Sequence, residues 1–388
     1  DLGVSFGAVA ADLDGDGDLD LIYTNFDRPP SLYRNNSQAN RIAVRLRGQG
    51  ANPFAVGARL FATTSAGRQS RRITLSHGAL SSTPADVFFG LGPDEQITRL
   101  EIFWPDGRSD VAENLAANHR YTFHESGESA KVATSALPPT LQPIFADVTA
   151  HSGLGFAHQN FPFDEFRGQA LLPMRQQSYD AGLAFGDANG DGNIDVYFAG
   201  GFGQPGQLYL GRGNGRFTPD VHPQPWTAGS GTHEIAPLWI DLNGDGAPDL
   251  FVTSGGVEHP EGSPELIDRL YLNDGSGGFR PAPAGMLPES LANSSVVAAA
   301  DFDHDGHLDL FVGGSTVPGK YPLASGSWLL KYRDGAFHSV APEIAPALGT
   351  LGRVTSAIWS DVNNDGWPDL LVATEWGPVR LFLNREGR

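Results

Sequence analysis

The sequence predicts an all-β protein: a β-propeller of about five or more blades, with one β-sandwich-like domain inserted or appended. Three observations support this fold class. An acidic nonapeptide occurs five times with the same spacing of acidic residues. Each copy is flanked by short apolar runs that are typical of strands rather than helices. The 49 Gly and 28 Pro residues indicate many tight turns and short strands.

The repeated nonapeptide has the pattern Asp-x-Asp/Asn-x-Asp-Gly-x-x-Asp. Positions 1, 3, 5 and 9 offer side-chain oxygens, Gly at position 6 permits a sharp turn, and the residue at position 7 would offer its backbone carbonyl. Such a set suits Ca²⁺, which takes six to eight oxygens, better than Mg²⁺, which retains more water. We therefore expect about five Ca²⁺ ions. The expected ligands are Asp12, Asp14, Asp16, Asp18 and Asp20; Asp187, Asn189, Asp191, Asn193 and Asp195; Asp241, Asn243, Asp245, Ala247 and Asp249; Asp301, Asp303, Asp305, His307 and Asp309; and Asp361, Asn363, Asp365, Trp367 and Asp369.

The loops differ from EF-hands. An EF-hand needs a bidentate Glu at position 12 and a helix on each side. Position 12 is apolar in every copy, and the residues are Tyr23, Phe198, Val252, Val312 and Val372. Each loop is therefore predicted to join two strands of a hairpin. A single copy could be a solvated acidic turn, but five copies with the same spacing argue against that interpretation.

Composition limits the class of protein. The chain has 388 residues, enough for two or three domains, and a formal net charge of −19. Because many of the 45 acidic side chains belong to the loops, the acidity is largely a metal-site signature and argues against nucleic acid as a partner. The absence of Cys excludes disulfides and thiol chemistry. No apolar run approaches the length of a membrane span.

Calcium sites of this kind suit an extracellular, secreted or cell-surface location, and the lack of Cys fits an exported bacterial protein. Because the chain begins with Asp rather than with Met and shows no signal peptide, we expect a mature product or a piece of a longer protein.

The first 143 residues are predicted to contain three segments. Residues 1–39 hold one strand–loop–strand unit and a further strand, a partial blade that cannot bury its faces alone. Residues 40–125 alternate between apolar and polar residues without an acidic loop, which predicts the β-sandwich-like domain. Residues 126–143 are small, polar and Pro-bearing, as in a linker. An anion site in the second segment is one interpretation and a solvated strand face is the favoured one; the basic residues concerned are Arg68, Arg71, Arg72 and His77.

From residue 144 to 388 the repeats resume. The first ligands at 187, 241, 301 and 361 are 54, 60 and 60 residues apart, and each period adds a third strand and a Gly-rich turn. Three or four short strands in this length make one propeller blade. The rival calcium-binding repeat, the parallel β-helix, has a period of about nine residues and is too short.

Several sequence segments resemble those of known families. FADVTAHSGL (145–154), the acidic loops and LYLNDGSGGF (270–279) resemble FG-GAP/VCBS repeats of integrin-α-like propellers. GARLFATTSAGRQSRRI (57–73), FGLG (89–92) and RLEIFWPDGRSD (99–110) resemble the ASPIC/UnbV domain. Together they resemble the cartilage-acidic-protein-like family, which implies a calcium-binding propeller. In that family a propeller usually precedes the ASPIC/UnbV domain, whereas here one repeat precedes it and four follow.

The two ends of the chain are complementary as sequence. Residue 1 starts in the middle of a unit, and the chain stops at LFLNREGR, where the next unit would begin. We therefore expect the N-terminal unit to act as a blade whose acceptor is the edge after Asn384. It would close the ring of its own chain or, the favoured version, complete that of a neighbour and build a filament.

Two functions follow from these observations. The favoured one is a non-enzymatic, calcium-stabilised extracellular structural or adhesion module, whose partners are other copies of the chain or a matrix or cell-surface protein or glycan. It rests on the lack of a recognisable catalytic motif. The alternative is a carbohydrate-binding, lectin-like or catalytic propeller with a site near the central channel. Its candidate residues are Asp180, His233, Glu234, Ser294, Ser295, Arg353 and Thr355. His158 is interpreted as a packing residue.

Overall fold

The computed structural model describes residues 5–25, 28–75, 81–125, 133–136, 145–179, 182–228, 231–289 and 293–387. In this part of the chain, strands dominate and the helices span only three to five residues, so the all-β prediction is confirmed. The helical turns are α1 (Thr149–Ser152), α2 (Glu165–Gly168), α3 (Ala341–Ile344), η1 (Gln176–Tyr179), η2 (Pro225–Ala228), η3 (Pro264–Leu266) and η4 (Pro346–Thr350). No helix of the described ranges is long and apolar enough to cross a membrane.

Five small sheets, antiparallel except for one added strand in the second, each contain one acidic loop between two neighbouring strands, and we call them blades 1 to 5. Blade 1 consists of β1 (Ser5–Ala11), β2 (Asp20–Asn25), β3 (Arg28–Asn35) and β13 (Phe145–Asp147). Blade 2 consists of β14 (Leu183–Gly186), β15 (Asp195–Phe198), β16 (Gln207–Gly211) and β17 (Phe217–Pro219), with β7 (Ser81–Ser82) added parallel to β14.

The other three blades repeat the same order of strands. Blade 3 consists of β18 (Glu234–Ile240), β19 (Asp249–Ser254), β20 (Arg269–Asn273) and β21 (Phe279–Pro281). Blade 4 consists of β22 (Ser294–Ala300), β23 (Asp309–Gly314), β24 (Trp328–Arg333) and β25 (Ala336–Ser339). Blade 5 has three strands, β26 (Val354–Ser360), β27 (Asp369–Thr374) and β28 (Arg380–Phe382). These sheets are consistent with propeller blades.

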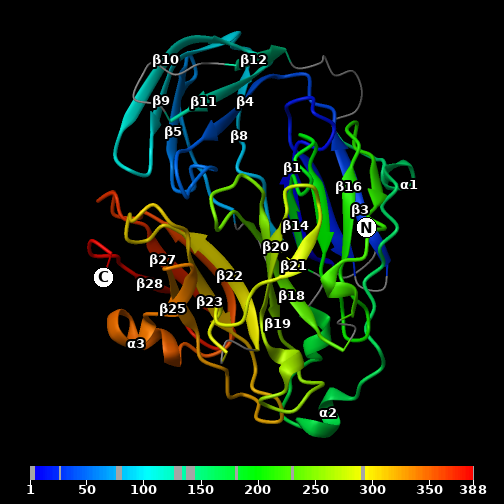
Figure 1. Cartoon of the computed structure of the whole chain (residues 1–388). Coiled ribbons are helices and arrows are strands. Elements are labelled where there is room, and N and C mark those ends of the chain that lie inside the picture. Colours follow the sequence, from blue (N-terminus) through cyan, green and yellow to red (C-terminus); the bar gives the residue numbers. More distant parts are fainter. Residues whose placement is uncertain are drawn as a thin grey trace.

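The inserted domain contains two four-stranded sheets, which lie at the top of Figure 1. One has the order β10 (Ser109–Ala116), β9 (Gln96–Phe103), β5 (Arg59–Thr64) and β6 (Gly67–Arg72). The other has the order β12 (Ala133–Ala136), β11 (His119–His124), β4 (Asn40–Arg47) and β8 (Val87–Gly92). Strand β12 falls within the predicted linker and pairs with β11, and the rest of that segment lies outside the described residues.

The blades pack face to face through apolar side chains. Val9 and Ile22 of blade 1 share one buried cluster with Phe185 and Val196 of blade 2. Similar clusters join blade 2 to blade 3 and blade 4 to blade 5. A larger cluster joins the inserted domain to blades 3 and 4. In Figure 1, blades 1 and 2 lie on the right, blades 4 and 5 at the lower left, and blade 3 between them.

The N-terminal unit is completed within its own chain. Strand β3 pairs with β13, so that Asn35 lies opposite Phe145, and the blade packs on blade 2. The expected acceptor, the edge after Asn384, is therefore wrong, because a strand that pairs with β3 follows the inserted domain. Among the described residues, nothing pairs with the outer edge of β28.

Asparagine side chains tie adjacent blades together. At the end of β20, the buried Asn273 donates hydrogen bonds from Nδ2 to the carbonyls of Ala188 in blade 2 and Pro248 in blade 3, at 2.8 and 2.9 Å. Asn384 makes the same link between Phe302 of blade 4 and Pro368 of blade 5, at 2.7 and 3.1 Å. One side chain thus satisfies buried carbonyls of two neighbouring acidic loops.

Candidate metal centres

We number the five acidic loops by blade: loop 1 (12–20), loop 2 (187–195), loop 3 (241–249), loop 4 (301–309) and loop 5 (361–369). In each loop the Asp at position 1 accepts a hydrogen bond from the N–H of the Gly at position 6, at 2.8 to 3.1 Å. The Asp at position 5 accepts one from the N–H of position 7, at 2.8 to 3.0 Å. These bonds turn the backbone so that the acidic side chains of positions 1, 3 and 5 share one small loop.

The turn requires left-handed backbone at two positions. The Gly at position 6 has φ between 87° and 99° in all five loops. Position 4 also has positive φ, which the sequence analysis missed although Gly and Asn there are a recognisable signal. The residues at position 4 are Gly15 (78°), Gly190 (71°), Gly244 (73°), His304 (59°) and Asn364 (61°).

The Asp at position 9 joins each loop to its sheet. It is buried in every blade, with at most 2% of its surface exposed. One carboxylate oxygen accepts the N–H of position 2, and the other accepts an N–H from the third strand or, in blade 5, from Asn384 just after that strand. The pairs are Asp20 with Leu13 and Asn35 (3.0 and 2.8 Å), Asp195 with Ala188 and Gly211 (2.8 and 2.7 Å), Asp249 with Leu242 and Asn273 (3.4 and 2.8 Å), Asp309 with Phe302 and Tyr332 (3.4 and 2.9 Å), and Asp369 with Val362 and Asn384 (2.9 and 2.8 Å).

Several of these carboxylates are buried without enough positive charge nearby to favour their ionised form. It raises the pKa of Asp309 to about 9 and that of Asp20 to about 8, and neighbouring carboxylates add to the shift. It also raises the pKa of Asp195, Asp249 and Asp301 to about 7. A raised carboxyl pKa means that the charged form is disfavoured in the folded protein. A bound divalent cation would supply the missing charge.

Two loops bring acidic oxygens into the range of one ion. One oxygen each from Asp12, Asp14 and Asp16 lies within 4.8 Å of the others, and the same holds for Asp301, Asp303 and Asp309. In the described part of the chain, several buried oxygens here accept no hydrogen bond: Oδ1 of Asp12, Oδ1 of Asp303 and both side-chain oxygens of Asp18. Buried carboxylate oxygens without donors are the ligands that a hard cation needs, so these two triads could hold metal ions.

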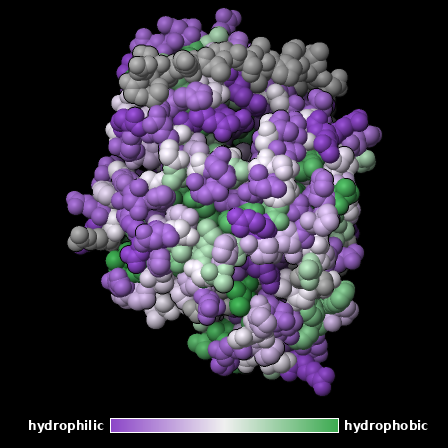
Figure 2. All heavy atoms as spheres, in the orientation of Figure 1, coloured by the Kyte–Doolittle hydropathy of each residue, from purple (hydrophilic) through white to green (hydrophobic). Residues whose placement is uncertain are grey.

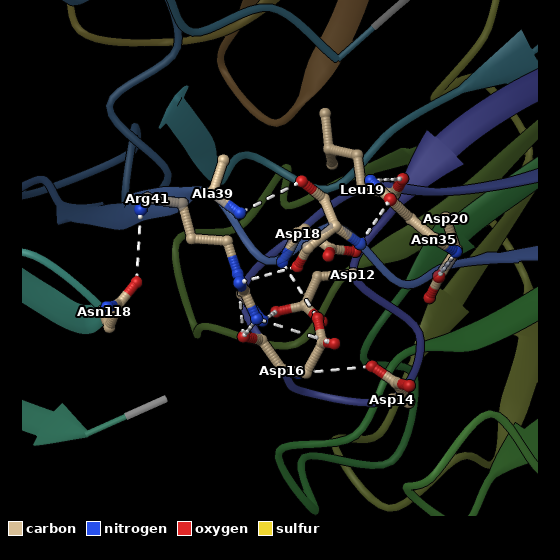
Figure 3. A network of polar contacts seen from close by, with 12 residues as sticks. Asp12, Asp14, Asp16, Asp18, Leu19, Asp20, Asn35, Ala39, Arg41 and Asn118 are labelled. Carbon is tan, nitrogen blue, oxygen red and sulfur yellow. Dashed lines mark hydrogen bonds and ion pairs between the residues drawn. The ribbon is translucent and has the colours of Figure 1, made fainter. Parts of the chain in front are cut away.

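Basic side chains contact three of the loops. At loop 1, Figure 3 shows the Arg41 guanidinium pointing into the group of Asp residues, where Nη2 donates to the Asp16 carbonyl at 2.7 Å. Arg120 also contacts Asp12. At loop 5, Arg59 Nη1 lies 2.8 Å from Asp361 Oδ2. All three arginines belong to the inserted domain, which is therefore held against loops 1 and 5 partly by charge.

Loop 4 is contacted by a lysine of its own blade. Lys331 Nζ contacts Asp303 Oδ2 and lies 2.9 Å from Asp305 Oδ2. Among the described residues, no Lys or Arg makes such an ion pair with a carboxylate of loop 2 or loop 3.

The residues of the alternative site are mostly buried and engaged elsewhere. His233 Nδ1 lies 3.1 Å from Glu258 Oε1, and Glu234 accepts a hydrogen bond from Tyr197 at 2.8 Å. Ser294 donates a hydrogen bond to Asp268, Ser295 donates one to the Val354 carbonyl, and Arg353 forms an ion pair with Glu375. Thr355 is exposed, and Asp180 lies outside the described residues. This arrangement serves packing within and between blades.

The other singled-out residues also have structural surroundings. His158 is buried against the Phe156 ring, with 6.5 Å between the ring centroids. Arg68 lies on Phe61 and pairs with Glu101, and Arg71 donates to the Phe88 carbonyl at 2.9 Å. These two arginines are exposed on β6, in agreement with a solvated strand face, whereas Arg72 is partly buried and His77 lies outside the described residues.

The comparisons with known proteins match the two kinds of domain. The family described as "ASPIC and UnbV" matches residues 48–130. The family described as "FG-GAP-like repeat" matches residues 187–252 and 241–312, which contain loops 2, 3 and 4. Loops 1 and 5 carry the same motif outside the matched residues.

Similarity to individual proteins is distant. Human cartilage acidic protein 1 is 32% identical over 161 residues, which cover 39% of this chain and 22% of that protein. The mouse protein of the same name is 22% identical over 425 residues, covering 99% of this chain and 60% of that protein. An Agrocybe aegerita lectin solved for its recognition of terminal N-acetylglucosamine aligns with a TM-score of 0.35 and 15% identity, covering 98% of this chain and 81% of the lectin. The chain therefore combines FG-GAP-like repeats with an ASPIC/UnbV domain and is distantly similar to cartilage acidic protein 1.

Proposed function

We propose that this protein is a non-enzymatic, extracellular structural or adhesion module whose five loops bind Ca²⁺. The observation that carries the proposal is the group of buried loop carboxylate oxygens without donors, on Asp12, Asp18 and Asp303. Burial also raises the pKa of Asp12 to about 6 and that of Asp18 to about 7. Positions 1, 3, 5 and 9 of each loop would hold the ion with the carbonyl of position 7. When bound, Ca²⁺ would supply the positive charge that offsets repulsion among the carboxylates.

Calcium content and thermal stability test the metal part of the proposal. Native mass spectrometry in excess Ca²⁺ should count about five bound ions, and EGTA should lower the melting temperature. A site at about 100-fold saturation adds about 2.7 kcal/mol to the free energy of unfolding. The proposal is refuted if no ion binds and the melting temperature in EGTA equals that in Ca²⁺.

The adhesive part is supported by the open side of blade 5. Strand β28 has an outer edge without a partner among the described residues, and apolar side chains surround it. Those exposed are Ile358, Trp376, Val379, Leu381 and Leu383. Elsewhere the face seen in Figure 2 is largely hydrophilic, with apolar residues in separate patches. An open edge beside apolar side chains favours strand addition by a partner.

We propose that this partner is another copy of the chain. Light scattering coupled to gel filtration in Ca²⁺ should then show a mass that grows with concentration. Leu381→Lys places a charge on the edge strand and should restore the monomer. A wild-type chain that remains monomeric at all concentrations would exclude self-assembly and leave a matrix or cell-surface partner.

Carbohydrate binding is the second candidate function. A cavity of about 490 Å³ lies between the inserted domain and loops 1 and 2, and its lining includes Arg45, Arg71, Asp86 and Arg120. Charged groups that line a concave site can bind sugar hydroxyls. A glycan array should show a specific signal that Arg71→Ala weakens, and an array without signal would exclude this candidate.

A further inference from the structure

Position 3 of the acidic loops occurs in two forms. Loops 1 and 4 have Asp14 and Asp303 at this position, whereas loops 2, 3 and 5 have Asn189, Asn243 and Asn363. The Asn side chains donate Nδ2 to the Asp at position 5, at 2.8 to 3.2 Å. An Asp at position 3 has no hydrogen to donate and adds a negative charge, so loops 1 and 4 need another source of positive charge.

A matching difference in sequence occurs at one aligned position, which lies on the third strand of blades 1 to 4 and just after β28 in blade 5. The N–H that binds the position 9 carboxylate belongs to Asn35, Gly211, Asn273, Tyr332 and Asn384 in blades 1 to 5. The residue immediately before it is Arg34, Leu210, Leu272, Lys331 and Leu383, in the same order. A basic residue therefore occurs in the two blades with Asp at position 3, and Leu occurs in the three with Asn.

The contacts in loop 4 explain this pairing. The Lys331 ammonium contacts Asp303 at position 3 and lies 2.9 Å from Asp305 at position 5. Asp303 is also one of the three carboxylates that gather within 4.8 Å in this loop. Loop 4 has one carboxylate more than loop 3, and the ammonium brings the two loops to the same net charge.

We propose that Lys331 is a tethered cation that stabilises loop 4 without metal and weakens Ca²⁺ binding there, so that loops 2 and 3 are the tight calcium sites. This inference rests on the proposed function. Ca²⁺ in loop 4 must share Asp303 and Asp305 with the ammonium, and two cations at one group of oxygens repel each other. Loops 2 and 3 have no such competitor among the described residues.

The test replaces Lys331 alone, and then Lys331 together with Asp303, in the full chain. Lys331→Leu should tighten the Ca²⁺ dissociation constant of loop 4 about tenfold, the order expected for removing one nearby charge. It should also lower the melting temperature in EGTA, because Asp303 and Asp305 lose their cation. Asp303→Asn/Lys331→Leu recreates the pairing of blade 3 and should keep the tight Ca²⁺ binding while restoring the melting temperature in EGTA.

Titration calorimetry and native mass spectrometry at stepped free Ca²⁺ supply the binding readout. Asp305→Ala in the Lys331→Leu background identifies the ion of loop 4, because that ion alone should be lost. Lys320→Leu, an exposed lysine paired with Glu261, is the matched control and should change neither measurement.

Two outcomes separate the inference from the proposed function. If Lys331→Leu and the double variant bind Ca²⁺ and melt as the wild type does, the inference is refuted while calcium binding stands. If neither the wild type nor any variant binds Ca²⁺, the proposed function itself is refuted. Should Lys331→Leu fail to fold, the double variant still decides, because it must show an additional tight site.

Discussion

Replacing Asn273 with Ala tests whether the blades are held together through their acidic loops. The side chain is buried, and its Nδ2 donates to the carbonyls of Ala188 and Pro248 at 2.8 and 2.9 Å. Asn273→Ala leaves these two acceptors without their donor in the space between blades 2 and 3. Each unsatisfied buried group costs about 1–3 kcal/mol, so the free energy of unfolding should fall by roughly 2–6 kcal/mol.

The assay is urea denaturation in saturating Ca²⁺, followed by tryptophan fluorescence. Trp239 of blade 3 and Trp226 of η2 lie in the cluster that joins blades 2 and 3, so their emission reports on this contact. Asn193→Ala is the control, because Asn193 occupies position 7 of loop 2, where loop 3 has Ala247. The control should change stability by no more than about 0.5 kcal/mol. The reasoning is refuted if Asn273→Ala loses no more stability than Asn193→Ala does.

Three further outcomes are expected. Asp245→Ala should remove one Ca²⁺ from the mass-spectrometric count, since this exposed carboxylate is an expected ligand of loop 3, and an unchanged count would contradict that assignment. Gly186→Ala should destabilise the protein by about 1–3 kcal/mol, because the added methyl would lie 2.8 Å from the Trp239 ring, and an unchanged melting temperature would show that the blades can separate at no cost. Burial raises the pKa of Asp268 to about 7, above its usual 3.8, so the folded state binds a proton that the unfolded state releases, and stability should fall as pH rises from 4 to 7. Asp268→Asn should flatten this part of the stability profile, measured by urea denaturation at constant Ca²⁺. An equal slope in both proteins would contradict the raised pKa of Asp268.

The acidic loops and their flanking strands were predictable because the information is local. A Gly with φ near 90° at position 6 and apolar residues after position 9 define a hairpin with few alternatives. The same local pattern predicted the five-fold repetition of the sheets. Calcium binding itself stays a prediction, supported by the donor-free oxygens of Asp12, Asp18 and Asp303.

The unpredicted features depend on contacts between distant residues. Arg120 reaches Asp12 across 108 positions, and Arg59 reaches Asp361 across 302, although neither arginine stands out in its own strand. The pairing of β13 with β3 was also missed, because three residues of strand have no periodicity that names a partner. Sequence patterns locate such residues on strands but do not say which other segment the fold brings to them.

The split construction of blade 1 bears on the order in which the chain folds. Asn35 and Phe145 are paired neighbours, yet about 110 residues of chain separate them. Closing that loop from an unfolded chain costs about 3 kcal/mol more than closing a four-residue hairpin, by the logarithmic dependence on loop length. A prefolded inserted domain shortens the flexible part of the loop and reduces this cost. Blade 1 should therefore mature late, after the inserted domain has its own core, and pulse-labelling hydrogen exchange would detect late protection of the β13 amides.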